Sequence, residues 1–190
     1  MILFDPDQPE AANGFPQLAV PPASTSSRAA LPTKPTLTRY LRQAQSAVGL
    51  PGEVSVLLTT DAGIRKLNRR FRHKNKATDV LSFPAAPPMS AGVKGDPASG
   101  LAGDLAISID TAARQAREQG HTLSIELRVL MLHGLLHLAG HDHETDKGQM
   151  AKAEQKLRAQ LRLPSGLIER ASSSKPETAP VKRLAKKAAR

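Results

Sequence analysis

The apolar residues of this chain follow two patterns, which together predict a domain of short strands and helices. Alternating or clustered apolar residues, typical of strands, occupy four segments: 2–4, 53–60, 78–83 and 103–109. The third segment stops at Pro84, which has no N–H to donate to a neighbouring strand. The sequence therefore predicts a small sheet whose strands are separated by other elements.

Helices are predicted between these strands, because apolar residues recur there every three or four positions. Three of them cover residues 37–48, 110–120 and 145–161. Another follows residue 60: Asp61 is its expected cap, and Ile64, Leu67 and Phe71 are its expected core face. Asp110 has the same expected role before the helix that ends at Gly120.

The segment 123–139 has a different pattern, since it is apolar on nearly every side. Thr122 precedes it as a predicted cap, and a helix without a polar face is expected to be buried. Strands mixed with helices in this order favour the α/β class. We therefore predict one domain with a mixed sheet of about four strands, packed with helices.

Three regions of different composition divide the chain. Residues 1–35 combine the first strand with an extension rich in Pro, Ser and Ala, in which Phe15, Leu18 and Val20 are weak evidence for one more strand. Residues 36–165 contain the regular patterns and are the predicted folded domain. Residues 166–190 are a basic segment that we expect to be disordered.

Composition limits the chemistry and the partners. The net charge is +10, half of it from residues 171–190, which carry six Lys or Arg and one Glu. This excess favours a polyanion as partner. Cysteine is absent, so any metal site must use N and O ligands, and a cytoplasmic location is expected. No run of apolar residues reaches the roughly 18 of a membrane span, so we expect no membrane association.

Four of the six histidines lie between residues 131 and 143. His133 and His137 are one helical turn apart, and Gly140 is a typical helix-ending residue after which His143 would return toward the helix. This is the spacing of the metzincin protease signature, but Gly134 occupies the position of its general-base glutamate. Three histidines at this spacing predict one Zn²⁺ per chain, with an open coordination position, in a metal site at the end of the buried central helix. Residues 36–165 are therefore the predicted catalytic, metal-binding domain.

Other interpretations of this run remain open. A single histidine in an apolar helix is usually a packed core residue, although three buried imidazoles without a metal would leave ring nitrogens unpaired. His141 is interpreted as a non-ligand and stays an alternative ligand. Asp142 either orients a ligand imidazole from behind or only forms the turn.

A dense basic segment precedes the third strand. Eight of the twelve residues 65–76 are Lys, Arg or His. Such a segment is either a solvated helix face or a contact surface for phosphates.

Three segments together resemble the bacterial YbeY family of ribosomal-RNA maturation endoribonucleases: 67–84 (LNRRFR, then KATDVLSFP), 103–108 (GDLAIS) and 133–143 (HGLLHLAGHDH). The resemblance covers about residues 36–163. It departs at His141, where the family usually has Tyr. The extensions 6–35 and 171–190 lie outside it.

The resemblance implies a function and a set of site residues. His133, His137 and His143 would hold zinc, Arg72 would approach the substrate phosphate, and Asp104 would support the site or a partner surface. It also implies single-strand-selective cleavage of precursor rRNA, maturation of the 3′ end of 16S rRNA, late 70S ribosome quality control, and the small ribosomal subunit and its proteins as partners. It is silent on oligomeric state.

Two other functions remain as alternatives. A non-catalytic RNA-binding ribosome assembly factor would use zinc only to stabilise its fold. A metzincin-like metalloprotease is disfavoured by Gly134 and by the lack of a clear Met-turn, since Met150 has the spacing of a core residue.

Overall fold

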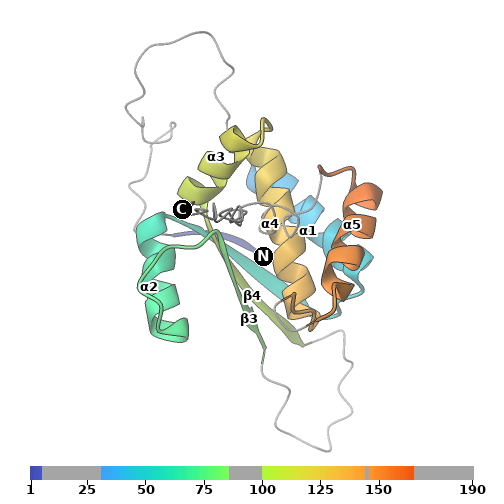
Figure 1. Cartoon of the computed structure of the whole chain (residues 1–190), viewed down its shortest axis with the longest axis horizontal. Coiled ribbons are helices and arrows are strands. Elements are labelled where there is room, and N and C mark those ends of the chain that lie inside the picture. The colour runs from blue at the N-terminus through green and yellow to red at the C-terminus, as the bar shows by residue number, and fades with distance from the viewer. Residues whose placement is uncertain (6–30, 86–99, 144–145, 165–190) are drawn as a thin grey trace, which may run out of the picture.

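The computed structural model describes residues 1–5, 31–85, 100–143 and 146–164, and within these ranges four strands form one sheet (Figure 1). The strands are β1 (Ile2–Phe4), β2 (Glu53–Thr59), β3 (Val80–Pro84) and β4 (Leu101–Ser108). Their order is β1-β2-β4-β3. β1 and β4 run parallel to β2, whereas β3 is antiparallel to β4 and forms one edge. The predicted mixed sheet of about four strands is confirmed.

Five helices accompany the sheet in the described ranges: α1 (Lys34–Val48), α2 (Asp61–Arg72), α3 (Ile109–Glu118), α4 (Leu123–Leu138) and α5 (Gln149–Leu161). Each corresponds to a predicted helix. The largest difference in bounds is at α5, which begins four residues later than expected, after Gly148 in a left-handed conformation (φ 87°). Among the strands, β3 begins two residues later than predicted, at Val80, whose N–H donates to the Asp79 carboxylate at 2.8 Å.

Two predicted helix caps are wrong by one or two residues. The Thr60 hydroxyl caps α2 by accepting the Gly63 N–H at 3.1 Å, and the Ser108 hydroxyl caps α3 by accepting the Thr111 N–H at 3.1 Å. In both helices a hydroxyl residue precedes the aspartate that the sequence favours as the cap. Asp61 instead accepts hydrogen bonds from the hydroxyls of Ser108 (2.5 Å) and Thr111 (2.6 Å), which ties the two helix starts together.

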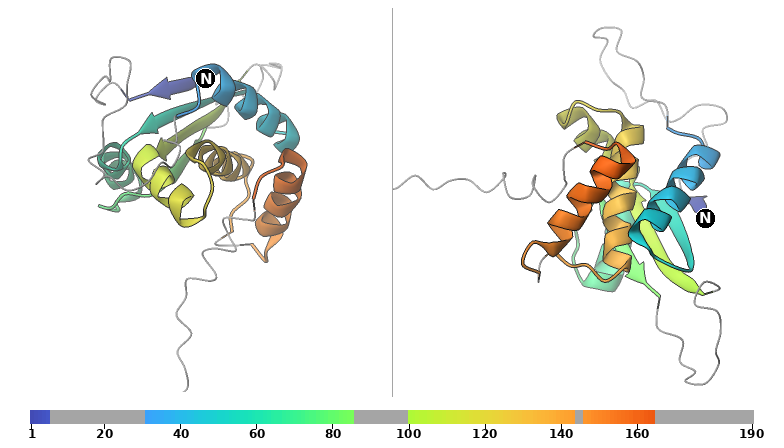
Figure 2. Two further views of the ribbon diagram at one scale, coloured as in Figure 1. Left: turned by 90° about the horizontal axis from the view of Figure 1, so that it is seen from above. Right: turned by 90° about the vertical axis from the view of Figure 1, so that its right-hand side faces the viewer.

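The helices cover the two faces of the sheet unequally (Figure 2). α1, α3 and α4 pack on the face of Leu105 and Ile107, and this layer contains the larger core. α5 lies outside α4, to which Met150 and Leu157 attach it. Among the described helices, only α2 lies on the opposite face, where Ile64 packs with a smaller cluster.

The predicted core face of α2 is partly wrong. Ile64 is fully buried and Leu67 is half-buried, but Phe71 is 53% exposed. Its ring packs edge to face on Phe83 of β3, with ring centroids 5.1 Å apart. Asn68 is buried in its place, and its side-chain amide donates to the Lys76 carbonyl at 2.8 Å.

α4 is the buried central helix that the sequence predicted. Thr122 caps it by accepting the Ile125 N–H, and twelve of its sixteen residues are buried. A Cβ atom on Gly134 would lie 2.7 Å from Leu105 Cδ2, far inside normal contact distance. The glycine therefore allows α4 to lie directly on β4.

Some predictions concern residues outside the described ranges. These are the possible strand near Phe15, Leu18 and Val20, and the disorder of residues 166–190. Within the described part of the chain, no helix has the length and apolarity that a membrane span requires.

Candidate metal centre

Three histidines converge where α4 ends. One ring nitrogen from each of His133, His137 and His143 lies within 4.8 Å of the others, and the ring centroids are 4.8–5.5 Å apart. These are the three residues that the 0, +4, +10 spacing brings together in the prediction. His133 and His137 extend from successive turns of the helix, and His143 comes from the segment after it.

Local backbone geometry explains how His143 returns to the helix. Gly140 adopts φ 90°, a conformation that other residues rarely adopt. The backbone N–H groups of Gly140 and His141 donate to the carbonyls of His137 (3.0 Å) and Leu136 (3.0 Å), closing the end of α4. The chain then reverses, so that His143 faces the last turn.

The site runs from the core to the surface. His133 is 5% exposed, His137 is half-buried and His143 is exposed. Burial, the largest cause, and the neighbouring His133 and His143 together lower the pKa of His137 to about 4, against the opposing effect of Asp142. A neutral imidazole is the form that binds metal, so the surroundings of His137 favour the ligand state near neutral pH.

The arrangement fits a metal ion that prefers nitrogen. The Nε2 atoms of His133 and His137 face each other at 3.2 Å. In a tetrahedral zinc site with bonds of about 2.0–2.1 Å, neighbouring ligand nitrogens lie about 3.3 Å apart. Three neutral imidazoles that leave one side toward solvent are the ligand set of a catalytic zinc site rather than a closed structural one.

The sequence also singled out three other residues near this centre. His141 is not one of the converging histidines. Asp142 is near enough to raise the pKa of His137, which agrees with an orienting role from behind the ligands. Asp104 is exposed on β4 between Gly103 and Leu105, both of which face α4, so its side chain projects from the opposite face. The role of Asp104 in a partner surface stays a prediction. From the face opposite α4, its side chain is not positioned to contact the three histidines.

Two residues that the sequence analysis did not identify lie directly behind the site. Glu154 of α5 is buried, and its Oε2 accepts a hydrogen bond from His133 Nδ1 at 3.1 Å. Arg158, one turn further, is also buried and donates through Nε to Glu154 Oε1 at 2.7 Å. A sequence signal for Glu154 exists: it continues the apolar stripe between Met150 and Leu157, where a charged residue needs a buried partner.

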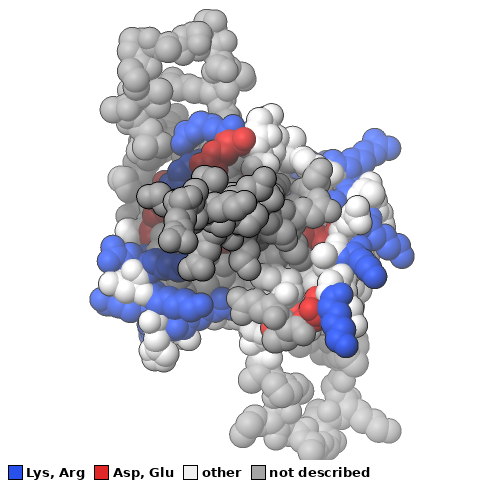
Figure 3. Space-filling model, in the orientation of Figure 1, with Lys and Arg blue, Asp and Glu red and all other residues white. Residues whose placement is uncertain are grey.

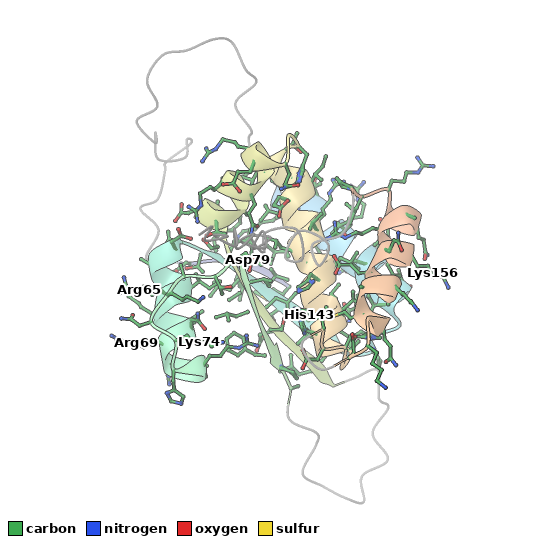
Figure 4. All side chains as sticks on the ribbon, viewed as in Figure 1. Arg65, Arg69, Lys74, Asp79, His143 and Lys156 are labelled. Carbon is green, nitrogen blue, oxygen red and sulfur yellow. The ribbon has the colours of Figure 1, made fainter. Side chains whose placement is uncertain are left out.

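The candidate catalytic arginine lies on another layer. Arg72 is exposed at the last residue of α2, on the far side of the sheet from α4. Figure 4 shows Arg65, Arg69 and Lys74 on one side of β3 and His143 on the other. β3 is an edge strand, and its Ser82 hydroxyl donates to the Gly134 carbonyl at 3.3 Å. β3 therefore lies between the basic side chains of α2 and the histidines of α4 (Figure 4).

The basic segment is held in a defined shape. His73 ends α2 with φ 57°, and the loop that follows is anchored by the Asn68 amide and by Arg65, whose Nε donates to Asn75 Oδ1 at 2.9 Å. The Lys and Arg side chains of 65–76 are exposed. They gather over α2 in the space-filling view, apart from a second group around α5 (Figure 3).

Fold and site together define an α/β protein with a three-histidine centre at the end of its buried helix. Comparison with known proteins makes this class specific. The family model of Endoribonuclease YbeY matches residues 26–162, and the chain belongs to the YbeY family. The matched residues include both the basic helix and the histidine cluster.

Curated relatives agree with this assignment. An Endoribonuclease YbeY of Koribacter versatilis is 51% identical over 152 residues, covering 80% of this chain and 89% of the relative. One of Solibacter usitatus is 51% identical over 140 residues, covering 74% and 87%. One of Nautilia profundicola is 48% identical over 120 residues, covering 62% and 78%.

Proposed function

We propose that this protein is a zinc-dependent endoribonuclease that cleaves single-stranded RNA during rRNA processing. The observation that carries the proposal is the convergence of His133, His137 and His143 within 4.8 Å, open to solvent on the side of His143. Membership of the YbeY family supports the endoribonuclease activity, since the relatives bear that name. The basic segment and the net charge of +10 support RNA as the substrate.

Each histidine has a definite part in holding the metal. His133 and His137 offer Nε2 atoms fixed by the buried end of α4, and His143 completes the set from the turn. The ion that these residues would hold supplies Lewis-acid chemistry and positive charge at the scissile phosphate. The exposed position of His143 leaves a phosphodiester free to approach from solvent.

Arg72 would act on the substrate and not on the metal. Its guanidinium is always charged and offers donors in a planar fork that matches two phosphate oxygens. An RNA strand that reaches both Arg72 and the histidines must cross the β3 edge, where Ser82 lies next to Gly134. Arg72 would then stabilise the negative charge that develops on the phosphate in the transition state.

The substrate is proposed to be precursor rRNA, with the 3′ end of 16S rRNA as the region cleaved. The small ribosomal subunit and its proteins would be the partners, late 70S quality control the setting, and the cytoplasm the location. Exposed Asp104, on the sheet face opposite the histidines, is a candidate contact for such a protein.

Metal analysis combined with an RNase assay tests the proposal. The purified full chain should contain about one zinc per molecule. It should cut single-stranded RNA faster than the matching duplex, lose cleavage after chelation and regain it on zinc addition. A protein that binds RNA and zinc but shows no zinc-dependent cleavage would instead be the assembly factor that uses zinc for its fold.

The protease alternative is weakened by the packing of Gly134. The metzincin base would extend from this position, but even a Cβ there would lie 2.7 Å from Leu105 Cδ2. A glutamate would require the buried Leu105 side chain, or α4 itself, to shift. The close contact of helix and sheet therefore disfavours that chemistry independently of the missing carboxylate.

A further inference from the structure

α5 takes part in the metal centre although it supplies none of the three histidines. It lies against α4 through contacts of Met150 and Leu157 with Leu132 and Leu136. These apolar contacts place one polar pair, Glu154 and Arg158, directly behind His133. The side chains of Glu154 and Arg158 are each at most 2% exposed.

The polar contacts form a continuous path. His133 Nδ1 is 3.1 Å from Glu154 Oε2, and Arg158 donates to Glu154 Oε1 through Nε at 2.7 Å and also through Nη2. Arg158 Nη1 donates to the Pro164 carbonyl at 3.0 Å, which attaches the chain after α5 to the same path. A carboxylate has only acceptors, so His133 must present an N–H at Nδ1. Its Nε2 then carries the lone pair, and this is the atom that faces His137.

We propose that Glu154 and Arg158 are positioning residues of the metal centre, which fix the tautomer and ring orientation of His133; this rests on the metal-binding function proposed above. Glu154 accepts the Nδ1 proton and thereby leaves Nε2 free to bind the ion. Arg158 holds the carboxylate through the oxygen that His133 does not use. Removal of such a partner typically lowers metal affinity about 10–100-fold.

The N-terminal end of α4 offers a matched control. Glu126 is also fully buried and also lies beside a histidine, with its Oε2 3.0 Å from His121 Nε2. Glu126 is about two helical turns before His133 on the same helix, and His121 lies just before the cap of that helix. Neither member belongs to the histidine cluster. Glu126→Gln therefore changes a buried carboxylate of the same helix without touching the centre.

The main experiment compares metal affinity in Glu154→Gln and Glu126→Gln by zinc competition with a chelator. In Glu154→Gln the new side-chain amide has one acceptor and one donor group, but both of its neighbours are donors, so it can accept properly from only one of them. We expect zinc affinity about 10–100-fold below the parent for Glu154→Gln, and parental affinity for Glu126→Gln. Equal affinity in the parent and in Glu154→Gln would overturn the proposal.

A second variant separates positioning from fold stability. Glu154→Gln combined with Arg158→Met removes both charges together, which avoids leaving one buried charge without its partner. We expect the metal-free double variant to melt near the parent, yet to bind zinc about as weakly as Glu154→Gln. Parental zinc affinity in this variant would show that the pair serves only packing.

The tautomer itself is measurable in the unmodified chain. With ¹⁵N-labelled histidine rings, NMR of the metal-free protein should show the His133 proton on Nδ1. A proton on Nε2 of His133 would contradict the proposed role of Glu154, independently of any metal-binding result. Because this measurement needs no metal, it also tells the two proposals apart: a parent that binds no zinc refutes the proposed function, while the Nδ1 proton still tests the path through Glu154.

Discussion

α4 and α2 lie on opposite faces of one sheet and divide the requirements of a nuclease between them. α4 is buried on nearly all sides and ends in the three converging histidines. α2 buries only Ile64 and Asn68, and exposes most of its basic residues to solvent. One helix is fixed by the packing around it, and the other displays charge.

The difference follows from what each task needs. Metal ligands must be held in one geometry, which a packed helix provides because its side chains have few alternative positions. Contacts with a flexible RNA backbone need positive charge within reach, and exposed Lys and Arg side chains provide it. Substitution of a metal ligand on α4 should therefore abolish metal binding. Substitution of a basic residue on α2 should instead reduce RNA binding or cleavage by an amount that depends on the residue.

The largest effect is expected from the ligands on α4. His133→Ala and His137→Ala should each release the metal, abolish cleavage and remove the thermal stabilisation that zinc gives, since bound metal stabilises the folded state. Zinc content after dialysis and melting with and without added zinc measure this. Full zinc content in both variants would place the metal site elsewhere.

A smaller but still large effect is expected at the end of α2. Arg72→Ala should keep its zinc and bind single-stranded RNA nearly as the parent does, but should lose about 10²-fold in kcat, the scale of removing one transition-state donor. Arg69→Ala, an exposed arginine of the same helix, is the control and should lose far less. Equal rates for the two variants would remove the special role of Arg72.

The next effect concerns how closely α4 lies on the sheet. Gly134→Glu introduces the protease base, whose Cβ would lie 2.7 Å from Leu105 Cδ2. Overpacking of this kind typically costs about 1–3 kcal/mol in unfolding free energy. Denaturant unfolding of the metal-free variant measures the cost, and peptide hydrolysis should stay absent. A variant as stable as the parent would mean that this contact is soft.

The sequence predicted most of the fold because each element has its own local signal. Apolar periodicity identified the helices, and the 0, +4, +10 spacing identified the three histidines that converge. Those signals depend on neighbours in the chain. The predictions failed where a residue's position depends on contacts with residues distant in the chain, or where two nearby residues are both suited to the same role.

Two examples make the limit concrete. Thr60 and Ser108, and not the aspartates one and two residues after them, cap their helices, since either type of side chain suits a cap and the backbone selects between nearby positions. Glu154 is 21 residues from His133, and only the packing of α5 on α4 brings them together. Phe71 has the right spacing for the core, but its ring packs only edge to face on Phe83 at the edge of the sheet and stays 53% exposed.

A smaller effect is expected from the exposed charges on α2, whose removal should change the salt dependence of RNA affinity and not the rate of the cleavage step. Lys66→Gln with Arg69→Gln removes two exposed cations, so the slope of log RNA affinity against log salt should fall by about 0.7 for each phosphate that the protein no longer neutralises. Lys152→Gln with Lys156→Gln on α5 makes the same charge change around the second basic group (Figure 3) and is the matched control. Identical slopes in the two pairs would mean that RNA does not distinguish α2 from α5.

The smallest effect is expected at His141, and it tests whether the site has three histidines or four. His141 follows Gly140, and its backbone N–H closes the end of α4 by donating to the Leu136 carbonyl at 3.0 Å. That contact does not depend on the side chain. The resemblance to the YbeY family implies Tyr at this position, so His141→Tyr should keep zinc content, zinc affinity and cleavage at parental values. His143→Tyr, two residues later, should lose zinc, because its ring belongs to the cluster. If His141→Tyr loses zinc and His143→Tyr keeps it, the turn after α4 presents the other histidine to the metal.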